Sequence, residues 1–255
     1  MTLDEQSARF DAVICDVDGC LSPETADPFD LPNLALIAAH NTRAIETGEF
    51  PPVTLCTGRP VPFAESMARA IRCPLPIMAE NGAWIWDPSD NSHELDPSIT
   101  IEHLDAIGEL TRWVESELGP RGVTVQPGKR AAVSLYHPDT ELLGTEVLRS
   151  AEARVVEAGW PIRVSMTWLY INLDLEHVSK ASAIERWIAK TGIQRERLAG
   201  IGDTTSDRKI REKVSFFACP GNAQDELKAE ADLVVESREA AGVVEILDRI
   251  SGADG

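Results

Sequence analysis

Short apolar segments, each followed by a helical pattern, constrain the fold of this chain most strongly. Ala12–Cys15 is apolar throughout and Val53–Cys56 nearly so, which predicts strands buried on both faces of a parallel sheet. A helix is predicted after each strand, at 31–47 and at 60–72, the second opened by a proline. This alternation predicts a right-handed parallel α/β arrangement.

The same alternation returns at the other end of the chain. A helix is predicted at Ser179–Thr191 and a buried strand at Leu198–Ile201, and weaker strand signals follow at Val214–Ala218 and Leu233–Val235. We therefore expect the two ends to be halves of one sheet.

The middle of the chain has a different pattern, which predicts an inserted α+β domain. Its expected elements are the strand pairs 123–125 with 131–136 and 162–164 with 169–173, and long amphipathic helices at 99–118 and 140–158. The predicted division is a core of residues 1–82 and 174–255 with an insertion of residues 83–173.

The charge of the chain limits its partners. Its formal net charge is -18, and a field of this sign repels nucleic acids and anionic membranes, so neither is expected as a partner. The first ten residues, MTLDEQSARF, lack the basic and apolar regions of a secretory signal, and five cysteines without a CxxC pair suggest neither zinc nor disulfides. These features favour a cytoplasmic protein with reduced thiols.

Two aspartates, Asp16 and Asp18, directly follow the first strand. Their spacing of two places both side chains on one side of an extended chain, where a cation or a shared proton must relieve their repulsion. The alternative is an Asx turn leading into Gly19.

A second acidic segment, Gly202–Asp207, follows the strand that ends at Ile201. Asp203 and Asp207 would be neighbours if a helix begins there, and together they could bind a hard divalent cation. The alternative is an ordinary helix-capping segment.

Thr57, Gly58 and Arg59 also follow a buried strand. A hydroxyl, an unhindered backbone N–H and a helix N-terminus suit a phosphate group, although the segment could be a plain turn.

Lys180 lies in a first helical turn, where a cation opposes the helix dipole unless an anion is near. Its alternatives are a solvated lysine or an ion pair with Asp174 or Glu176.

These four segments are predicted to converge. Ligands of open parallel sheets bind beyond the carboxyl ends of the strands, where Asp16, Thr57 and Asp203 all stand. We expect Lys180 on the same rim.

In this order, DVDGC, TGR, the isolated Lys180 and GDTTSD resemble the four motifs of the haloacid dehalogenase superfamily. The position of the insertion, and the segment Glu80–Ala83, are similar to the subgroup with a large α/β cap, which includes Cof-like sugar phosphatases. The resemblance implies a Rossmann-like parallel-sheet core with an inserted α+β cap. Cys20 stands where the family commonly has threonine, and Thr204–Ser206 replace the middle of the usual fourth motif.

The resemblance also implies a magnesium-dependent phosphatase. Asp16 would attack phosphorus and form an aspartyl phosphate, and Asp18 would protonate the leaving oxygen and later activate water. Thr57, Gly58 and Lys180 would hold the phosphate. Mg²⁺ would be bound by Asp16, Asp203 and the backbone carbonyl of Asp18, with Asp207 supporting the site directly or through water.

Asp18 favours phosphate monoesters over halides, because an alkoxide needs a proton on leaving and a halide does not. The substrate class that the resemblance implies is a phosphorylated sugar or small organic acid, with Arg59 and Asn81 as candidate substrate contacts. A few of six residues on or near the cap strands are further candidate contacts, although such cations are more often solvated and such aromatics more often pack in a core: Lys129, Arg130, Tyr136, His137, Arg163 and Trp168.

Two other functions stay open from the sequence. One is a phosphomutase, since phosphomannomutases resemble this chain in cap type and in the DxDG segment. The other is a non-catalytic binding protein on the same fold.

Overall fold

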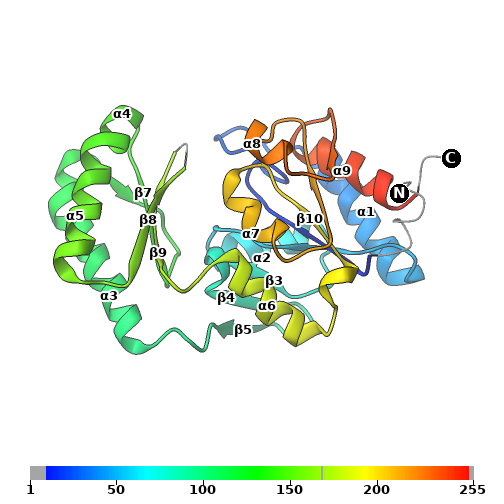
Figure 1. Ribbon diagram of the computed structural model, residues 1–255, viewed down its shortest axis with the longest axis horizontal. Helices are drawn as coiled ribbons and strands as arrows, with labels where there is room; N and C mark the ends of the chain where they lie inside the picture. The colour runs from blue at the N-terminus through cyan, green and yellow to red at the C-terminus, as the bar shows by residue number, and fades with distance from the viewer. Residues whose placement is uncertain (1–9, 168, 253–255) are drawn as a thin grey trace. The chain divides into compact units, whose positions relative to one another are not determined.

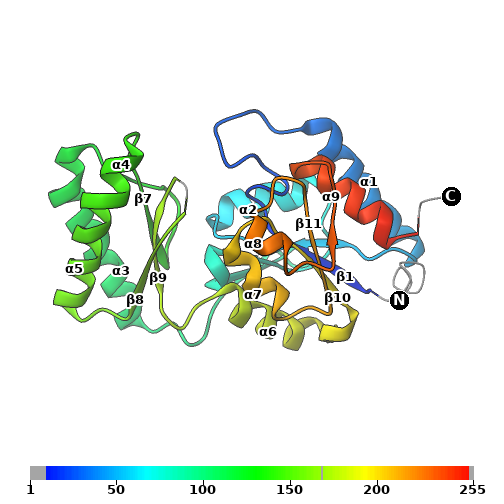
Figure 2. The ribbon, with the colours of Figure 1, turned by 45° about the horizontal axis from the view of Figure 1, so that its top comes forward.

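The computed structural model describes residues 10–252 except residue 168 (Figures 1 and 2). The chain forms two compact units. One comprises the residues up to Glu94 and those from Ser179 onward, and the other comprises Leu95–Val178. Within the described residues, no helix is both long and apolar enough to cross a membrane.

A five-stranded parallel sheet forms the centre of the first unit, with the strand order β12-β11-β10-β1-β2. Its strands are β1 (Ala12–Cys15), β2 (Val53–Leu55), β10 (Leu198–Ile201), β11 (Phe216–Cys219) and β12 (Leu233–Val234). The two ends of the chain therefore build one sheet, and the predicted α/β class is confirmed.

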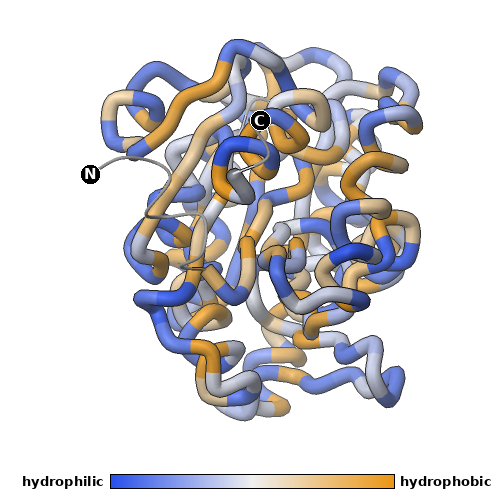
Figure 3. The backbone as a smooth tube through the Cα atoms, turned by 90° about the vertical axis from the view of Figure 1, so that its right-hand side faces the viewer, coloured by the Kyte–Doolittle hydropathy of each residue, from blue (hydrophilic) through white to orange (hydrophobic). Residues whose placement is uncertain are grey.

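Helices cover both faces of this sheet. They are α1 (Leu31–Thr47), α2 (Val61–Ala70), α6 (Lys180–Thr191), α7 (Arg208–Arg211), α8 (Asp225–Lys228) and α9 (Glu239–Ile250). Side chains of β1 alternate between the faces: Val13 and Cys15 pack in a cluster with α1, α2 and α9, whereas Ala12 and Ile14 pack with α6, α7 and α8. Hydrophobic and hydrophilic residues accordingly alternate along the outer helices (Figure 3).

Three further strands of the first unit were not predicted from the sequence. They are β3 (Ile77–Ala79), β4 (Trp84–Asp87) and β5 (Ser92–Leu95), which form a small sheet in the order β3-β4-β5. A bridge between Cys56 and Met78 sets β3 beside the end of β2. Residues 83–94, which the sequence assigned to the insertion, belong to the first unit because β4 pairs with β3. Residues 174–178, which it assigned to the core, belong to the second unit.

The second unit contains a four-stranded antiparallel sheet in the order β6-β7-β9-β8. Its strands are β6 (Thr124–Val125), β7 (Ala132–Tyr136), β8 (Ile162–Met166) and β9 (Ile171–Leu175), and its helices are α3 (Ile101–Trp113), α4 (Thr140–Leu142) and α5 (Leu148–Ala158). The two predicted strand pairs form, and the helices lie on one side of the sheet (Figure 1). Each predicted long helix contains a π-helical turn, at Val114–Leu118 and Leu143–Val147.

The register of the central sheet decides where its polar side chains meet. Cys15, the last residue of β1, pairs with Leu55 on one side and with Ile201 on the other. The three strands therefore end level with one another, and the segments that follow them emerge side by side at one edge of the sheet.

Candidate active site

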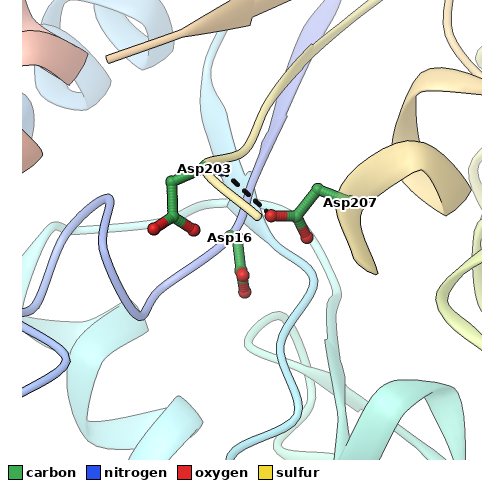
Figure 4. Close-up of side chains that lie close together, drawn as sticks. All are labelled: Asp16, Asp203 and Asp207. Carbon is green, nitrogen blue, oxygen red and sulfur yellow. Dashed lines mark hydrogen bonds between the residues drawn. The ribbon is translucent and has the colours of Figure 1, made fainter. Parts of the chain in front are cut away.

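Three buried aspartates meet at the carboxyl edge of the central sheet (Figure 4). One carboxylate oxygen from each of Asp16, Asp203 and Asp207 lies within 4.8 Å of the others. Asp16 follows β1 directly, and the other two belong to the segment after β10. The convergence predicted from strand ends is present for these residues.

The loop after β1 wraps tightly around one carbonyl group. Val17 O accepts hydrogen bonds from the backbone N–H groups of Cys20, Leu21 and Ser22, and Val17 N donates to Asp16 Oδ1 at 2.8 Å. Gly19 has φ +69, and a Cβ built there would lie 1.8 Å from Asp203 Oδ2. Only glycine allows the two acidic loops to approach this closely.

The segment after β10 is a short 3₁₀ turn, Thr205–Asp207, that leads into α7. Asp207 Oδ2 accepts hydrogen bonds from the backbone N–H groups of Asp203 and Thr204, at 3.0 and 3.1 Å. The capping role that the sequence left open is therefore real. Asp207 can cap this turn and still belong to the aspartate cluster, because its other oxygen, Oδ1, accepts a hydrogen bond from Lys180.

Lys180 connects the two acidic loops. Its Nζ lies 2.9 Å from Asp16 Oδ2 and 2.6 Å from Asp207 Oδ1, and its side chain is 6% exposed. Ser179 caps α6 through its side chain and so places Lys180 in the first turn. The alternatives of a solvated lysine and of an ion pair with residues 174 or 176 are wrong.

Burial and mutual repulsion set the protonation of the cluster. Burial, followed by the charge of Asp207, raises the pKa of Asp16 to about 8, although Lys180 opposes this rise. Burial, followed by the charges of Asp207 and Asp16, raises the pKa of Asp203 to about 9. Burial alone would lower the pKa of Lys180, but the two aspartates beside it outweigh burial and raise that pKa.

The cluster fits a divalent cation on its own chemistry. Asp203 Oδ1 is buried and has no hydrogen-bond partner among the described residues. An orphaned carboxylate oxygen beside two further carboxylates is costly unless a proton or a cation accompanies it. Oxygen ligands of this type suit Mg²⁺, which prefers hard carboxylate and water ligands.

The segment after β2 lies beside the loop after β1, because β2 is the neighbour of β1 on the side away from β10. Thr57 is fully buried, its N–H donates to Met78 O, and its Oγ1 accepts from Arg59 N at 3.1 Å. Asn81 N donates to Thr57 O, and a Cβ on Gly58 would lie 3.1 Å from Asn81 Oδ1. Gly58 and Asn81 therefore lie against each other.

Asp18 is held differently from the other aspartates. Both of its carboxylate oxygens accept hydrogen bonds from the guanidinium of Arg59, at 2.5 to 2.9 Å. Its carboxylate is not part of the three-aspartate cluster.

The candidate contacts from the predicted cap lie in the second unit, where several make local bonds. Lys129 donates to Ser134, His137 interacts with the backbone carbonyls of Arg121 and Asp139, and Arg163 donates to the carbonyls of Glu176 and Val178. Tyr136 packs against Tyr170, with ring centroids 5.8 Å apart. Trp168 lies outside the described residues.

Two residues that support the acidic loops were missed by the sequence analysis. Asn222 donates to Gly19 O at 2.8 Å and accepts from Glu239 N at 2.7 Å. Gln224 accepts from Thr205 N at 2.9 Å through its side chain, and its own N–H donates to Asp203 O at 2.7 Å. Both residues follow the buried strand β11. Ligands of open parallel sheets bind beyond the carboxyl ends of the strands, so the position of these residues after a strand is a signal that could have identified them.

A family model described as haloacid dehalogenase-like hydrolase matches residues 13–115 and 150–247. The chain belongs to this hydrolase family. The resemblance inferred from the four motifs is thereby confirmed, as is the prediction that the chain is an enzyme. As a member of the haloacid dehalogenase-like hydrolases, it matches several curated relatives over nearly their whole length.

Two curated relatives are phosphatases. The chain is 22% identical to the phosphoglycolate phosphatase of Methanosarcina acetivorans, over 94% of this chain and 96% of that protein. It is also 22% identical to the 5-amino-6-(5-phospho-D-ribitylamino)uracil phosphatase of Bacillus subtilis, over 97% and 98% of the two chains. A solved structure from Thermoplasma acidophilum has the same fold, with a TM-score of 0.74, 19% identity, and coverage of 95% and 98%.

Proposed function

We propose that this protein is a magnesium-dependent phosphatase of small phosphate monoesters that works through an aspartyl phosphate on Asp16. The observation that carries the proposal is the buried cluster in which Lys180 touches both Asp16 and Asp207 beside the orphaned oxygen of Asp203. A lysine among three carboxylates provides one cation where two or three negative charges need compensation. The remaining charge favours a divalent ion.

Asp16, Asp203, Asp207 and the backbone carbonyl of Asp18 would hold the magnesium ion. When bound, it would offset the negative charges of the phosphate and of the carboxylates that face it. Asp207 already accepts three hydrogen bonds from Lys180, Asp203 and Thr204, so its contribution is chiefly to fix the loop and supply charge.

Asp16 is the proposed nucleophile. Its carboxylate oxygen would form a bond to phosphorus as the bond from phosphorus to the ester oxygen breaks, and Lys180 keeps the carboxylate oriented through the 2.9 Å contact with Oδ2. Thr57, Gly58 and Lys180 would bind the phosphoryl oxygens during this transfer.

Asp18 would act as the general acid and then as the general base. It would give a proton to the departing ester oxygen and then take one from the water that attacks the phosphorus of the aspartyl phosphate. Cleavage of the bond between that phosphorus and Asp16 would release inorganic phosphate and regenerate the free carboxylate.

For the substrate, we propose a phosphorylated small organic acid or a sugar phosphate. Two relatives, each 22% identical to this chain, support this substrate class: a phosphoglycolate phosphatase and a 5-amino-6-(5-phospho-D-ribitylamino)uracil phosphatase. Phosphoglycolate and a set of sugar phosphates are therefore the first compounds to test.

The test of the proposed function compares two substitutions at opposite ends of β1. Asp16→Asn should abolish phosphate release from a generic aryl phosphate in the presence of magnesium, because the amide is a poor nucleophile. Asp11→Asn is the matched control, since Asp11 pairs with Arg197 at the surface and should leave the rate unchanged. Near wild-type hydrolysis by Asp16→Asn would refute the assignment, and failure of the wild-type enzyme to release inorganic phosphate would leave a phosphomutase or a binding protein.

A further inference from the structure

Three hydrogen-bond contacts join Arg59 to Asp18 at the site. Arg59 Nε lies 2.9 Å from Asp18 Oδ1 and 2.8 Å from Oδ2, and Nη2 lies 2.5 Å from Oδ1. The two side chains are 19% and 29% exposed. A guanidinium that binds both oxygens of a carboxylate fixes the plane of that carboxylate as well as its distance.

Arg59 is itself held from three directions. Its backbone N–H donates to Thr57 Oγ1 at 3.1 Å, its carbonyl accepts from Glu80 N at 3.0 Å, and its guanidinium lies 4.8 Å above the ring of Phe63. The backbone bonds tie Arg59 to the loop that follows β2, and the ring contact ties its head group to α2. The guanidinium is therefore a fixed reference point against which another side chain can be oriented.

We propose that Arg59 is the positioning residue for Asp18. This inference rests on the proposed function, in which Asp18 carries the proton to and from the ester oxygen. The Asp18 carboxylate stands in a turn and is partly exposed, so it would sample several rotamers without a partner. Arg59 removes that freedom and holds the carboxylate in one orientation.

The chemistry of the pair leaves proton transfer possible. A carboxylate offers about four acceptor sites, and Arg59 makes its three contacts with them through two nitrogens, Nε and Nη2. The acceptor capacity that these contacts leave free is available for the proton that moves to the leaving group or from water. Arg59 cannot take that proton itself, because its guanidinium stays protonated.

The alternative is that Arg59 binds the substrate directly, as considered from the sequence. In that case N–H donors of its guanidinium that do not bond Asp18 would bind the substrate, and loss of Arg59 would raise KM for every substrate. The two roles predict different kinetics, because proton delivery matters most when the leaving group is a poor one.

The experiment measures kcat and KM of Arg59→Gln, Asp18→Asn and the double variant on two substrates. One is an alkyl phosphate, whose alkoxide needs a proton to leave, and the other is p-nitrophenyl phosphate, whose phenolate leaves readily. Positioning predicts that Arg59→Gln lowers kcat on the alkyl phosphate about 10-fold to 100-fold, which is less than the roughly 10²–10⁴-fold that the acid–base group itself supplies, and lowers it much less on the aryl phosphate. It also predicts that the double variant is no slower than Asp18→Asn alone.

Two controls separate positioning from loss of structure. Arg69→Gln removes an arginine that forms an exposed pair with Glu65 on α2, and it should leave both rates unchanged. Arg59→Lys keeps the charge but cannot bond both oxygens of Asp18 as a guanidinium does. The ratio of its kcat values on the two substrates should therefore lie between the ratios of the wild type and of Arg59→Gln.

The inference is overturned if Arg59→Gln raises KM equally for both substrates and if the rate losses of Arg59→Gln and Asp18→Asn multiply in the double variant. It is also overturned if Arg59→Gln and Arg69→Gln have the same rates. It is also overturned if Asp18→Asn slows both substrates to the same extent. The proposed function is judged separately, by phosphate release from the wild type and its loss in Asp16→Asn.

Discussion

Gly19 and Asp203 approach each other so closely that a Cβ on Gly19 would lie 1.8 Å from Asp203 Oδ2. The two residues come from loops after different strands, and the contact brings the β1 loop against the carboxylate whose other oxygen is orphaned. The site therefore depends on a residue with no side chain as much as on its charged ones.

Gly19→Ala should displace the β1 loop and weaken both magnesium binding and hydrolysis. The control is Gly48→Ala, since Gly48 has a similar φ of +68 but no atom within 4 Å of a built Cβ. Gly48→Ala should cost about 1 kcal/mol of unfolding free energy from backbone strain and leave activity intact. Gly19→Ala should cost roughly 1–3 kcal/mol more and lower activity, as urea titrations and rate measurements would establish. Equal behaviour of the two variants would mean that the loop contact is unimportant.

Lys180→Met should strongly destabilise the protein. It leaves Asp16 and Asp207 buried without their shared cation, and breaking a buried ion pair typically costs about 3–5 kcal/mol. Lys209→Met, which removes an exposed pair with Glu212, should cost less than about 1 kcal/mol. The free energies of unfolding of both variants in metal-free buffer give the comparison, and a small loss for Lys180→Met would contradict it.

Magnesium should stabilise the protein more at high pH than at low pH. The pKa values of Asp16 and Asp203 are raised from 3.8 to about 8 and about 9, so the folded metal-free protein binds more protons than the unfolded chain over this interval. Its free energy of unfolding therefore falls as pH rises through the interval. Mg²⁺ competes with those protons, so its binding should release protons and tighten as pH rises.

The measurement is thermal unfolding with and without magnesium between pH about 6 and about 9, together with calorimetry in buffers of different ionisation enthalpy. Asp203→Asn removes one titrating ligand and should flatten the dependence. A magnesium-induced stabilisation that is constant over this range in the wild type would contradict the assignment of these groups as ligands.

Asn222→Ala should slow hydrolysis although Asn222 is not a proposed ligand. The amide bonds Gly19 O and Glu239 N, so its removal leaves two polar backbone groups without this partner and loosens the β1 loop. A loss of about 1–3 kcal/mol of unfolding free energy is expected, with reduced affinity for magnesium. Unchanged magnesium affinity would show that the loop keeps its shape without Asn222.

The sequence predicted those parts of the molecule that follow from local pattern. Wholly apolar runs such as Ala12–Cys15 have few alternatives to a buried strand, and the acidic residues after them must then emerge at one edge. β3 and β5 were not predicted, for two different reasons. Ile77–Ala79 is too short to show a pattern, and Ser92–Leu95 is polar and partly exposed, so it lacks the alternation of a strand.

Contacts between distant side chains could not be predicted in the same way. The sequence placed Lys180 on the rim of the site, but only the packing of α6 decides that its Nζ bonds Asp16 and Asp207 rather than residue 174 or 176. The bonds between Asp18 and Arg59 join residues 41 positions apart, and they depend on rotamers of a long side chain. No local pattern encodes such a choice.

The most direct test of the account is to trap the phosphoryl group on the enzyme. The wild-type protein, mixed with a phosphate monoester and magnesium and quenched in acid during turnover, should carry one added phosphoryl group, which mass spectrometry of the digest should locate on the peptide that contains Asp16. Asp16→Asn should carry none under the same conditions. A phosphoryl group on any other residue, or steady phosphate release by Asp16→Asn, would contradict the central claim that Asp16 is the nucleophile.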